Sequence, residues 1–245
     1  MTVVAIHQPC YIPWLPFFEK IKKSDVFVFL DDVQYQKNGW QNRNKIRTND
    51  GSIWLTIPVN AHFKSKSNEI KIDYTQNWVD KHKKSFLINY SKAKYFNENW
   101  KDLEKIYDMN FETLTELNLE IISFIQKKFN IETKIMLSSE LDISSSSSER
   151  ILDICKKLDA DVYYSGQGYG MPEKKYLDEE DFSKNNIETK KNVTIILLNA
   201  LLFLILILTA FFRTCLKMRL VLMFSFFAPL SWFVLAHGHS SAHYG

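Results

Sequence analysis

The sequence predicts an α/β fold, with helices on both faces of a mostly parallel sheet, followed by a membrane-type C-terminal segment. Two stretches show the order strand, helix, strand, and such βαβ units build parallel sheets that are covered by helices. A third stretch, residues 193–212, contains no charged residue. We therefore expect a three-layer, Rossmann-like sheet and, after it, one transmembrane helix or a helical hairpin.

The first βαβ unit lies at the N-terminus. The β-branched run TVVAI predicts a buried strand, and LPFFEKIKKS predicts a helix whose first turn tolerates Pro16. The apolar run DVFVFLDD predicts the second strand, which ends in two acids. No charged leader with a long apolar run precedes the first strand, so no signal peptide is expected.

The middle of the chain has two different patterns. Residues 52–60 and 68–73 alternate between apolar and polar residues, which predicts two strands that could pair as a hairpin. Residues 78–130 have a mostly helical pattern, with breaks near Asn97 and Asp108.

The second βαβ unit follows this helical stretch. Residues 133–141 predict a strand, and the serine run 144–148 predicts a loop that could cap the next helix, 148–158. The run DVYYSG, residues 161–166, predicts a strand that leads into a glycine-containing turn.

The predicted domains are a soluble α/β domain over 1–190, a hydrophobic segment over 193–236 and a polar tail over 237–245. Within the hydrophobic segment, the uncharged run 193–212 is long enough to span a bilayer, and 220–236 is at the lower limit. We expect a cytoplasmic domain that is anchored at the inner (cytoplasmic) membrane through this tail. The sequence leaves open whether the tail crosses once or twice.

The charge and the cysteines exclude several classes of protein. Of the 31 Lys and Arg residues, three lie after residue 192, so residues 1–192 carry 28 basic against 28 acidic residues. This balance gives no electrostatic case for a nucleic-acid partner. The three cysteines, Cys10, Cys155 and Cys215, form neither a disulfide framework nor a zinc pattern. No metal site is predicted, and the sequence names no cofactor.

The loop after the first strand is the first candidate site, because His7, Gln8, Tyr11 and Trp14 crowd into it. In open α/β sheets, ligands bind beyond the carboxyl ends of the strands. A histidine in this position can act as an acid, a base or an electrostatic stabiliser. The alternative is a histidine that only satisfies the local backbone.

The end of the second predicted strand carries Asp31 and Asp32. Paired acids can bind a metal, orient a histidine or accept a proton, although aspartate is also a common turn former. Soon after them comes a loop dense in planar polar groups: Trp40, Gln41, Asn42, Arg43, Asn44 and Lys45. Arginine suits phosphate or carboxylate, the amides suit sugar hydroxyls or a base edge, and tryptophan offers a stacking face. A polar turn before the next strand is the alternative.

The third candidate is the glycine-rich turn that begins at Ser165 and Gly166 and continues through Gly168. Such a turn lets backbone N–H groups approach a ligand anion. It lacks the Gly-Lys-Ser/Thr sequence of a P-loop and is not a complete dinucleotide fingerprint.

Several long runs, taken in order, resemble the WbqC-like protein family over residues 3–182. They are AIHQPCYIPWLPFFEKI, DVFVFLDDVQYQKNGWQNRNKI, IWLTIPV, and SERILDICKKLDADVYYSGQGYG with KKYLDEEDF. The family is associated with bacterial surface-polysaccharide (O-antigen) gene clusters, so the resemblance implies that context. After Phe182 the chain departs from the family, which continues with a soluble segment rich in histidine, proline and aromatic residues.

By this likeness, interest extends to His7, Gln8, Pro9, Tyr11, Pro13, Trp14, Asp31, Gln41, Asn42, Arg43, Ser165, Gly166 and Tyr176. The opening also resembles, more distantly, HIGH-type nucleotidyltransferases, which place a phosphate-binding histidine after the first strand. The second histidine step of that motif is replaced here by the segment from Tyr11 to Trp14.

The leading hypothesis is an enzyme that transfers an acyl or aminoacyl group to a nucleotide-linked sugar. His7 would act in proton transfer, Asp31 would orient it, and Arg43 would hold a phosphate or carboxylate. The expected substrate-binding residues are Gln8, Tyr11, Trp14, Asp32, Trp40, Gln41, Asn42, Asn44, Lys45, Ser165, Gly166, Gly168 and Tyr176. The alternatives are a non-catalytic sugar-nucleotide-binding or scaffolding protein at the membrane, and an inactive product of a rearranged gene.

Overall fold

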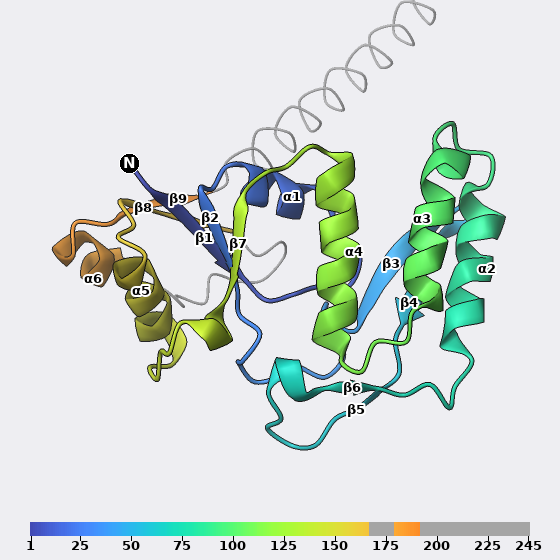
Figure 1. Ribbon diagram of the computed structural model, residues 1–245, viewed down its shortest axis with the longest axis horizontal. Coiled ribbons are helices and arrows are strands. Elements are labelled where there is room, and N and C mark those ends of the chain that lie inside the picture. The colour runs from blue at the N-terminus through green and yellow to red at the C-terminus, as the bar shows by residue number, and fades with distance from the viewer. Residues whose placement is uncertain (167–178, 192–245) are drawn as a thin grey trace, which may run out of the picture. The chain divides into compact units, whose positions relative to one another are not determined.

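The computed structural model describes residues 1–166 and 179–191, and all of them fall within one compact unit (Figure 1). The strands are β1 (Val3–His7), β2 (Val26–Phe29), β3 (Arg43–Thr48), β4 (Gly51–Thr56), β5 (Val59–Asn60), β6 (Lys71–Ile72), β7 (Lys134–Leu137), β8 (Val162–Ser165) and β9 (Glu188–Lys191). The α-helices are α1 (Leu15–Lys22), α2 (Trp78–Tyr90), α3 (Phe96–Asp108), α4 (Leu114–Lys128), α5 (Ser147–Lys157) and α6 (Glu179–Lys184).

In the described part of the chain, five strands form one sheet in the order β7-β2-β1-β8-β9. All four neighbouring pairs are parallel, so the predicted α/β fold with a mostly parallel sheet is confirmed. The chain adds strands on one side of β1, through β2 and β7, and then on the other side, through β8 and β9. The strand order therefore reverses between β1 and β8.

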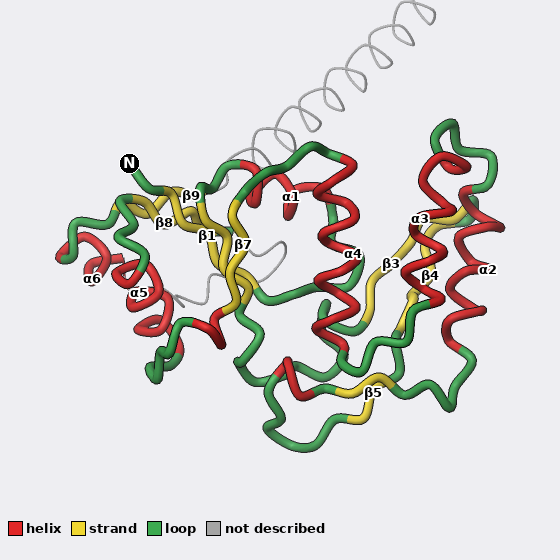
Figure 2. The backbone as a smooth tube through the Cα atoms, in the orientation of Figure 1, coloured by secondary structure: helices red, strands yellow, loops and turns green. Residues whose placement is uncertain are grey.

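Helices cover both faces of this sheet, which gives three layers (Figures 1 and 2). On one face, Phe17 and Ile21 of α1 pack with Ala5, Phe27 and Ile122. On the other face, the core combines Val4, Ile6 and Val28 with residues of α5 and α6: Leu152, Ile154, Cys155 and Phe182. The side chains of β1 alternate between the two faces, so His7 projects on the same side as Ala5, toward α1.

The long connection between β2 and β7, residues 30–133, forms a separate region beside the three-layered sheet. It contains the antiparallel pairs β3–β4 and β5–β6 and the helices α2, α3 and α4, with a core of its own. Helix α4 serves both cores, because Leu117 and Ile121 belong to this core and Ile122 belongs to the core of the sheet. Figure 1 shows α4 between the sheet and the pair α2–α3.

Most predicted elements appear near their expected places, and three differ. The segment from Trp40 to Lys45 was expected as a loop, but Arg43–Thr48 is strand β3 and pairs with β4. The expected strand 52–60 is interrupted at Ile57–Pro58, and only its last two residues pair with the region 68–73. Strand β9 was not expected, because its sequence ETKK is polar and sits at the edge of the sheet.

The predictions for the C-terminal tail, over 193–236 and 237–245, lie outside the described residues. Within residues 1–166 and 179–191, no helix is both long enough and apolar enough to cross a membrane. Attachment to the inner membrane stays a prediction.

Candidate functional site

The carboxyl ends of β1 and β8 form the candidate site, because the strand order reverses between them. In open parallel sheets the loops diverge at such a point and leave a crevice in which ligands bind. His7 ends β1, and Ser165 ends β8 and is followed by Gly166. The structure therefore brings His7 and the described start of the glycine-rich turn, Ser165 and Gly166, to one edge of the sheet.

His7 is half-buried at this edge and is held by its immediate neighbours. Its Nδ1 lies 2.9 Å from the backbone oxygen of Gln8, and its ring packs edge-on against Phe17 at 5.2 Å. Burial lowers the pKa of His7 to about 4, and the positive charge of Lys20 acts in the same direction. The imidazole is therefore neutral at pH 7, and if Nδ1 donates to Gln8, Nε2 can accept a proton.

Lys20 lies beneath this edge and is only 4% exposed. Its Nζ donates to the backbone oxygen of Ile6 at 2.7 Å, and a Cβ placed on Gly166 would lie 3.6 Å from the same Nζ. Burial lowers the pKa of Lys20 to about 7, although nearby Cys10 partly offsets the shift. No carboxylate in residues 1–166 or 179–191 pairs with this amine.

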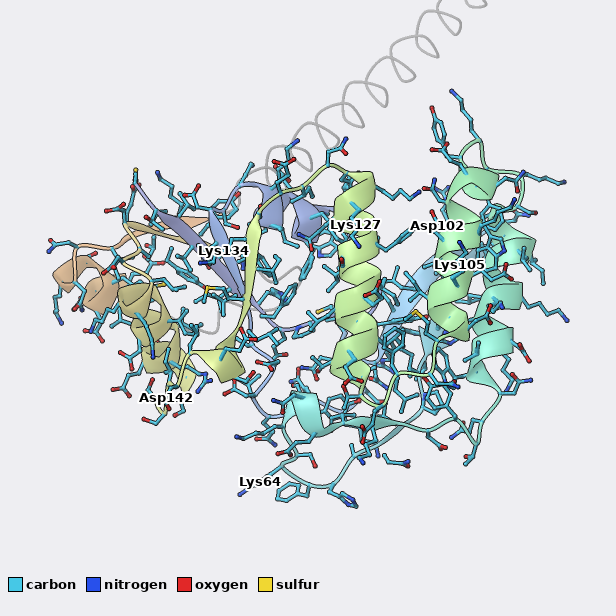
Figure 3. The ribbon with its side chains drawn as sticks, viewed as in Figure 1. Lys64, Asp102, Lys105, Lys127, Lys134 and Asp142 are labelled. Atoms are coloured by element: carbon cyan, nitrogen blue, oxygen red, sulfur yellow. The ribbon has the colours of Figure 1, made fainter. Side chains whose placement is uncertain are left out.

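The surroundings of Lys20 are unusual for a lysine of this chain. The lysines labelled in Figure 3, at positions 64, 105, 127 and 134, are all exposed. Lys20 does not stand out in the sequence, because it lies in a lysine-rich run. The helical spacing of the run does indicate its burial, because Lys20 lies on the same face of α1 as three other buried residues: Phe17, Ile21 and Ser24.

Cys10 completes the cluster but does not supply a nucleophile. Its Sγ lies 3.5 Å from the backbone oxygen of Gln8 and 3.9 Å from His7 Nδ1. Burial raises the pKa of the Cys10 thiol to about 12, against a smaller opposite effect of Lys20. The thiol therefore stays protonated near neutral pH, where only a thiolate would be strongly nucleophilic.

Asp31 does not orient His7, and this prediction is wrong. Its carboxylate is 3% exposed and accepts hydrogen bonds from Ser139 N at 3.0 Å, Ser139 Oγ at 2.6 Å and Ser138 Oγ at 3.2 Å. A longer contact of 3.5 Å comes from Asn68 Nδ2. Asp31 thus joins the end of β2 to the turn after β7 and to Asn68, which precedes β6.

Asp32 is held by intramolecular contacts, and its expected role in substrate binding stays a prediction. Both of its oxygens are bound by Arg150 Nη2, at 2.7 and 2.5 Å, and Ser138 Oγ makes a further hydrogen bond. Burial alone would raise the pKa of Asp32, but the hydrogen bond from Ser138 and the charge of Arg150 lower it overall. The ion pair connects β2 with α5.

Tyr11 and the amides after Trp40 hold the loop that carries His7. Tyr11 is fully buried, and its hydroxyl bonds to His82 Nδ1 at 2.8 Å and to the hydroxyl of Tyr107. Asn44 Nδ2 donates to the backbone oxygens of Tyr11 and Ile12, at 3.1 and 2.7 Å. Ile12 has a φ of 44°, a strained value for a β-branched residue, and these hydrogen bonds support it.

Two further residues that were expected to bind substrate are also internal. Gln41 is 4% exposed, and its Nε2 donates to Gln8 Oε1 and to Ser67 Oγ, both at 3.0 Å. Asn42 is 5% exposed and donates to the backbone oxygen of Ile57 at 3.1 Å. The structure thus gives Tyr11, Gln41, Asn42 and Asn44 a scaffold role, and substrate contact by them stays a prediction.

Arg43 and Lys45 lie on the outer face of the β3–β4 pair, together with an aromatic residue that the sequence analysis missed. The ring of Trp54 has the Arg43 guanidinium at 4.4 Å and the Lys45 amine at 5.0 Å from its centre. Trp40 packs against Trp54 at 5.6 Å, and the two rings are 54% and 43% exposed. We call Trp40, Arg43, Lys45 and Trp54 the aromatic–basic patch.

A buried, unpartnered pair of polar atoms accompanies this patch. The hydroxyl of Tyr35 and the Nε of Arg43 are both buried and have no hydrogen-bond partner among the described residues. The two groups interact, since the charge of Arg43 lowers the pKa of Tyr35 against the larger upward effect of burial. An unsatisfied donor on a cationic side chain such as Arg43 suits an anionic acceptor.

The remaining predicted residues divide into two groups. Trp14 is 47% exposed at the start of α1, and Gln8 is half-buried beside His7. Gly168 and Tyr176 lie outside the described residues.

Within the described ranges, no three His, Cys, Asp or Glu side chains come together as a metal site.

The fold defines a class: open-sheet α/β proteins whose strand order reverses beside the first strand. Residues 8–193 match the model of the WbqC-like protein family, so the chain belongs to that family. The match extends past Phe182, where the sequence analysis had placed a departure from the family.

One relative among curated proteins is "Uncharacterized protein Rv1507c" of Mycobacterium tuberculosis. It is 34% identical over 190 residues, which cover 76% of this chain and 80% of that protein. No solved structure matched the chain.

Proposed function

We propose that this protein transfers an acyl or aminoacyl group to an amino sugar carried on a nucleotide, in the assembly of a bacterial surface polysaccharide. The observation that carries the proposal is the neutral, half-buried imidazole of His7, placed above the buried amine of Lys20 where the strand order reverses. The polysaccharide context rests on family membership.

The proposed reaction needs one group that accepts and returns a proton. The sugar amine attacks the carbonyl carbon of the acyl donor and forms a C–N bond, while His7 Nε2 accepts the amine proton. The bond between the acyl carbon and the donor's leaving group then breaks, and the leaving group takes the proton from His7. Because His7 is neutral at pH 7, it can accept the proton at the start of the cycle.

Lys20 is a positioning residue in this proposal, because a side chain that is 4% exposed does not reach substrate. Burial lowers the pKa of His7 most, and the charge of Lys20 lowers it further, so both favour the neutral imidazole. The hydrogen bond of Lys20 to Ile6 also fixes the end of the strand that carries His7.

The aromatic–basic patch supports the nucleotide part of the proposal. Exposed tryptophan rings can stack on a base, and the guanidinium of Arg43 beside them can pair with a phosphate. The patch and the His7 loop are joined by backbone contact, since Tyr11 N donates to the oxygen of Trp40 at 2.9 Å.

The test is turnover of nucleotide-linked amino sugars with acyl-CoA or aminoacyl donors, measured by mass spectrometry. We expect His7→Ala to reduce turnover by at least about 100-fold without unfolding the protein. Arg43→Ala should raise the KM for the nucleotide sugar, whereas Arg47→Ala, on the same exposed strand, should leave it unchanged. Wild-type turnover in both His7→Ala and Arg43→Ala would contradict the proposal.

A non-catalytic sugar-nucleotide-binding protein is the second candidate, and the aromatic–basic patch is the observation that favours it. The patch could bind a nucleotide without any chemistry at His7. In that case, calorimetry would detect nucleotide-sugar binding that survives His7→Ala but is lost in Arg43→Ala, with no turnover in either variant.

A further inference from the structure

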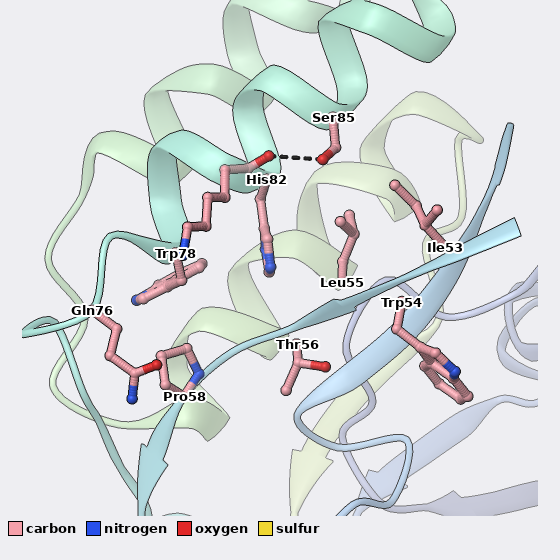
Figure 4. Close-up of a pocket in the computed structure, with 10 residues that line it drawn as sticks. Ile53, Trp54, Leu55, Thr56, Pro58, Gln76, Trp78, His82 and Ser85 are labelled. Carbon is pink, nitrogen blue, oxygen red and sulfur yellow. Dashed lines mark hydrogen bonds between the residues drawn. The ribbon is translucent and has the colours of Figure 1, made fainter.

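A pocket of about 320 Å³ lies between β4 and α2 and uses none of the residues placed at the His7 crevice (Figure 4). Trp78, His82 and Ser85 recur at helical spacing and line the α2 side of the pocket. Ile53 and Leu55 line the β4 side. The sequence analysis had assigned no function to these residues.

One wall of the pocket contains an unsatisfied hydrogen-bond donor. Trp78 is 4% exposed, and its indole Nε1 is buried without a partner among the described residues. Figure 4 shows the nitrogen-bearing edge of the ring turned toward Gln76 and Pro58, which also line the pocket. A buried donor without an acceptor is rare in folded proteins and points to a missing acceptor.

Two other features make this end of the pocket favourable for an anion. Helix α2 begins at Trp78, and the side chain of its N-cap residue, Asn77, makes no capping hydrogen bond. The helix dipole therefore presents its positive end here, with Asp80 offsetting part of the effect. Lys81 also lines the pocket, and no carboxylate in the described ranges forms an ion pair with it.

The β4 side of the pocket is apolar, because Ile53 and Leu55 line it. A ligand that satisfies both walls must carry a small anionic group and a hydrocarbon part. A phosphate dianion fits less well, because its additional oxygens would need more donors than the indole and Lys81 provide.

We propose that this pocket binds a small organic carboxylate, whose oxygens accept the Trp78 N–H and pair with Lys81 while its hydrocarbon part packs on Ile53 and Leu55. Trp54 of the aromatic–basic patch also lines the pocket, but the proposed contacts of the carboxylate use no residue of the patch or of the His7 loop. His82 lines the pocket as well, and its Nδ1 is held by the Tyr11 hydroxyl at 2.8 Å.

The experiment uses the full chain with ¹⁵N-labelled tryptophan and follows the indole N–H signals during titration with sodium butyrate. Trp78→Phe identifies the signal of Trp78 among the six tryptophans. We expect this signal to move downfield and saturate with butyrate but to stay in place with butyramide, the neutral analogue of the same shape. Lys81→Ala should weaken butyrate binding by about fivefold, as expected for loss of one partly exposed charge. Lys84→Ala, which removes an exposed lysine of the same helix outside the pocket, should not.

Three results would overturn the proposal. They are an unmoved Trp78 signal at saturating butyrate, an equal shift with butyramide, and tighter binding of inorganic phosphate than of butyrate. If Trp78→Phe does not fold, calorimetry on the wild type, Lys81→Ala and Lys84→Ala decides the question. Equal butyrate affinity in all three proteins would then overturn it.

Discussion

The carboxyl ends of β1 and β2 are neighbours in the sheet, with His7 paired in register to Phe29, yet their polar residues have opposite surroundings. At the end of β2, Asp31 accepts hydrogen bonds from Ser138 and Ser139, and both oxygens of Asp32 contact Nη2 of Arg150. At the end of β1, His7 and Lys20 meet no carboxylate among the described residues, and burial lowers the pKa of both. Polar residues with all their partners in place hold a fold together, whereas partly unsatisfied ones remain available for chemistry.

The largest expected effect lies on the β2 side. Arg150→Ala leaves the Asp32 carboxylate without its cation. The side chain of Asp32 is 16% exposed and that of Arg150 is 10% exposed. We expect the free energy of unfolding, measured in urea, to fall by about 3 kcal/mol. Lys71→Ala, which removes the exposed pair with Glu112, is the control and should change it little. Equal losses of stability in the two variants would show that the Asp32–Arg150 pair at the end of β2 holds the fold no more firmly than an exposed ion pair.

Asp31→Ala tests the other acid of β2. The change removes the acceptor for Ser138 and Ser139, so we expect a loss of about 2 kcal/mol in urea denaturation. At a temperature where the variant is folded, its turnover per folded molecule should match the wild type. Unchanged stability together with lost turnover would instead place Asp31 at the substrate.

Lys20→Met tests the β1 side through the pH dependence of stability. The pKa of Lys20 is about 7 in the folded protein and near its ordinary value of 10.5 in the unfolded chain, so between these values only the unfolded state holds the proton. Wild-type stability should therefore rise with pH from about 7 toward 10, by at most about 1.4 kcal/mol per pH unit relative to Lys20→Met.

The matched control is Lys22→Met, which removes an exposed lysine of the same helix. Its stability should follow the pH profile of the wild type. A constant difference between the wild type and Lys20→Met from pH 7 to pH 9.5 would show that Lys20 is not held in a low-pKa environment.

The smallest expected effect on stability comes from Gly166→Ala. The added methyl group would make an ordinary contact at 3.6 Å with Lys20 Nζ, so stability should change by less than about 0.5 kcal/mol. If ligands enter above Lys20, the same methyl group should weaken nucleotide-sugar binding in calorimetry. Unchanged binding would place the ligand away from this part of the crevice.

The continuous apolar runs, separated by helical segments, were enough to predict the sheet, because parallel strands are buried on both faces. His7 and Ser165 could be placed at one edge because each ends one of these parallel strands. The strand Arg43–Thr48 was missed because its residues RNKIRT are mostly polar, and its pairing with β4 is a tertiary effect. Pattern alone does not identify such strands.

The partners of polar side chains could not be predicted from the sequence. Asp32 and Arg150 are 118 positions apart, and Asn44 reaches back 33 positions to Tyr11. Such contacts decide whether a polar residue is structural or available, and only the folded chain brings them together. Lys20 is the exception, since its place on the apolar stripe of α1 was visible in the sequence.

The central claim is that His7 is a neutral base above a buried amine, and the most direct measurement is its titration by NMR. The full chain with ¹³C-labelled histidine has six imidazole signals, and His7→Gln identifies the one from His7. We expect His7 to titrate with a pKa of about 4 in the wild type and at a higher value in Lys20→Met, because the neighbouring charge is gone. A pKa near the ordinary value of 6.5 in both proteins would contradict the account.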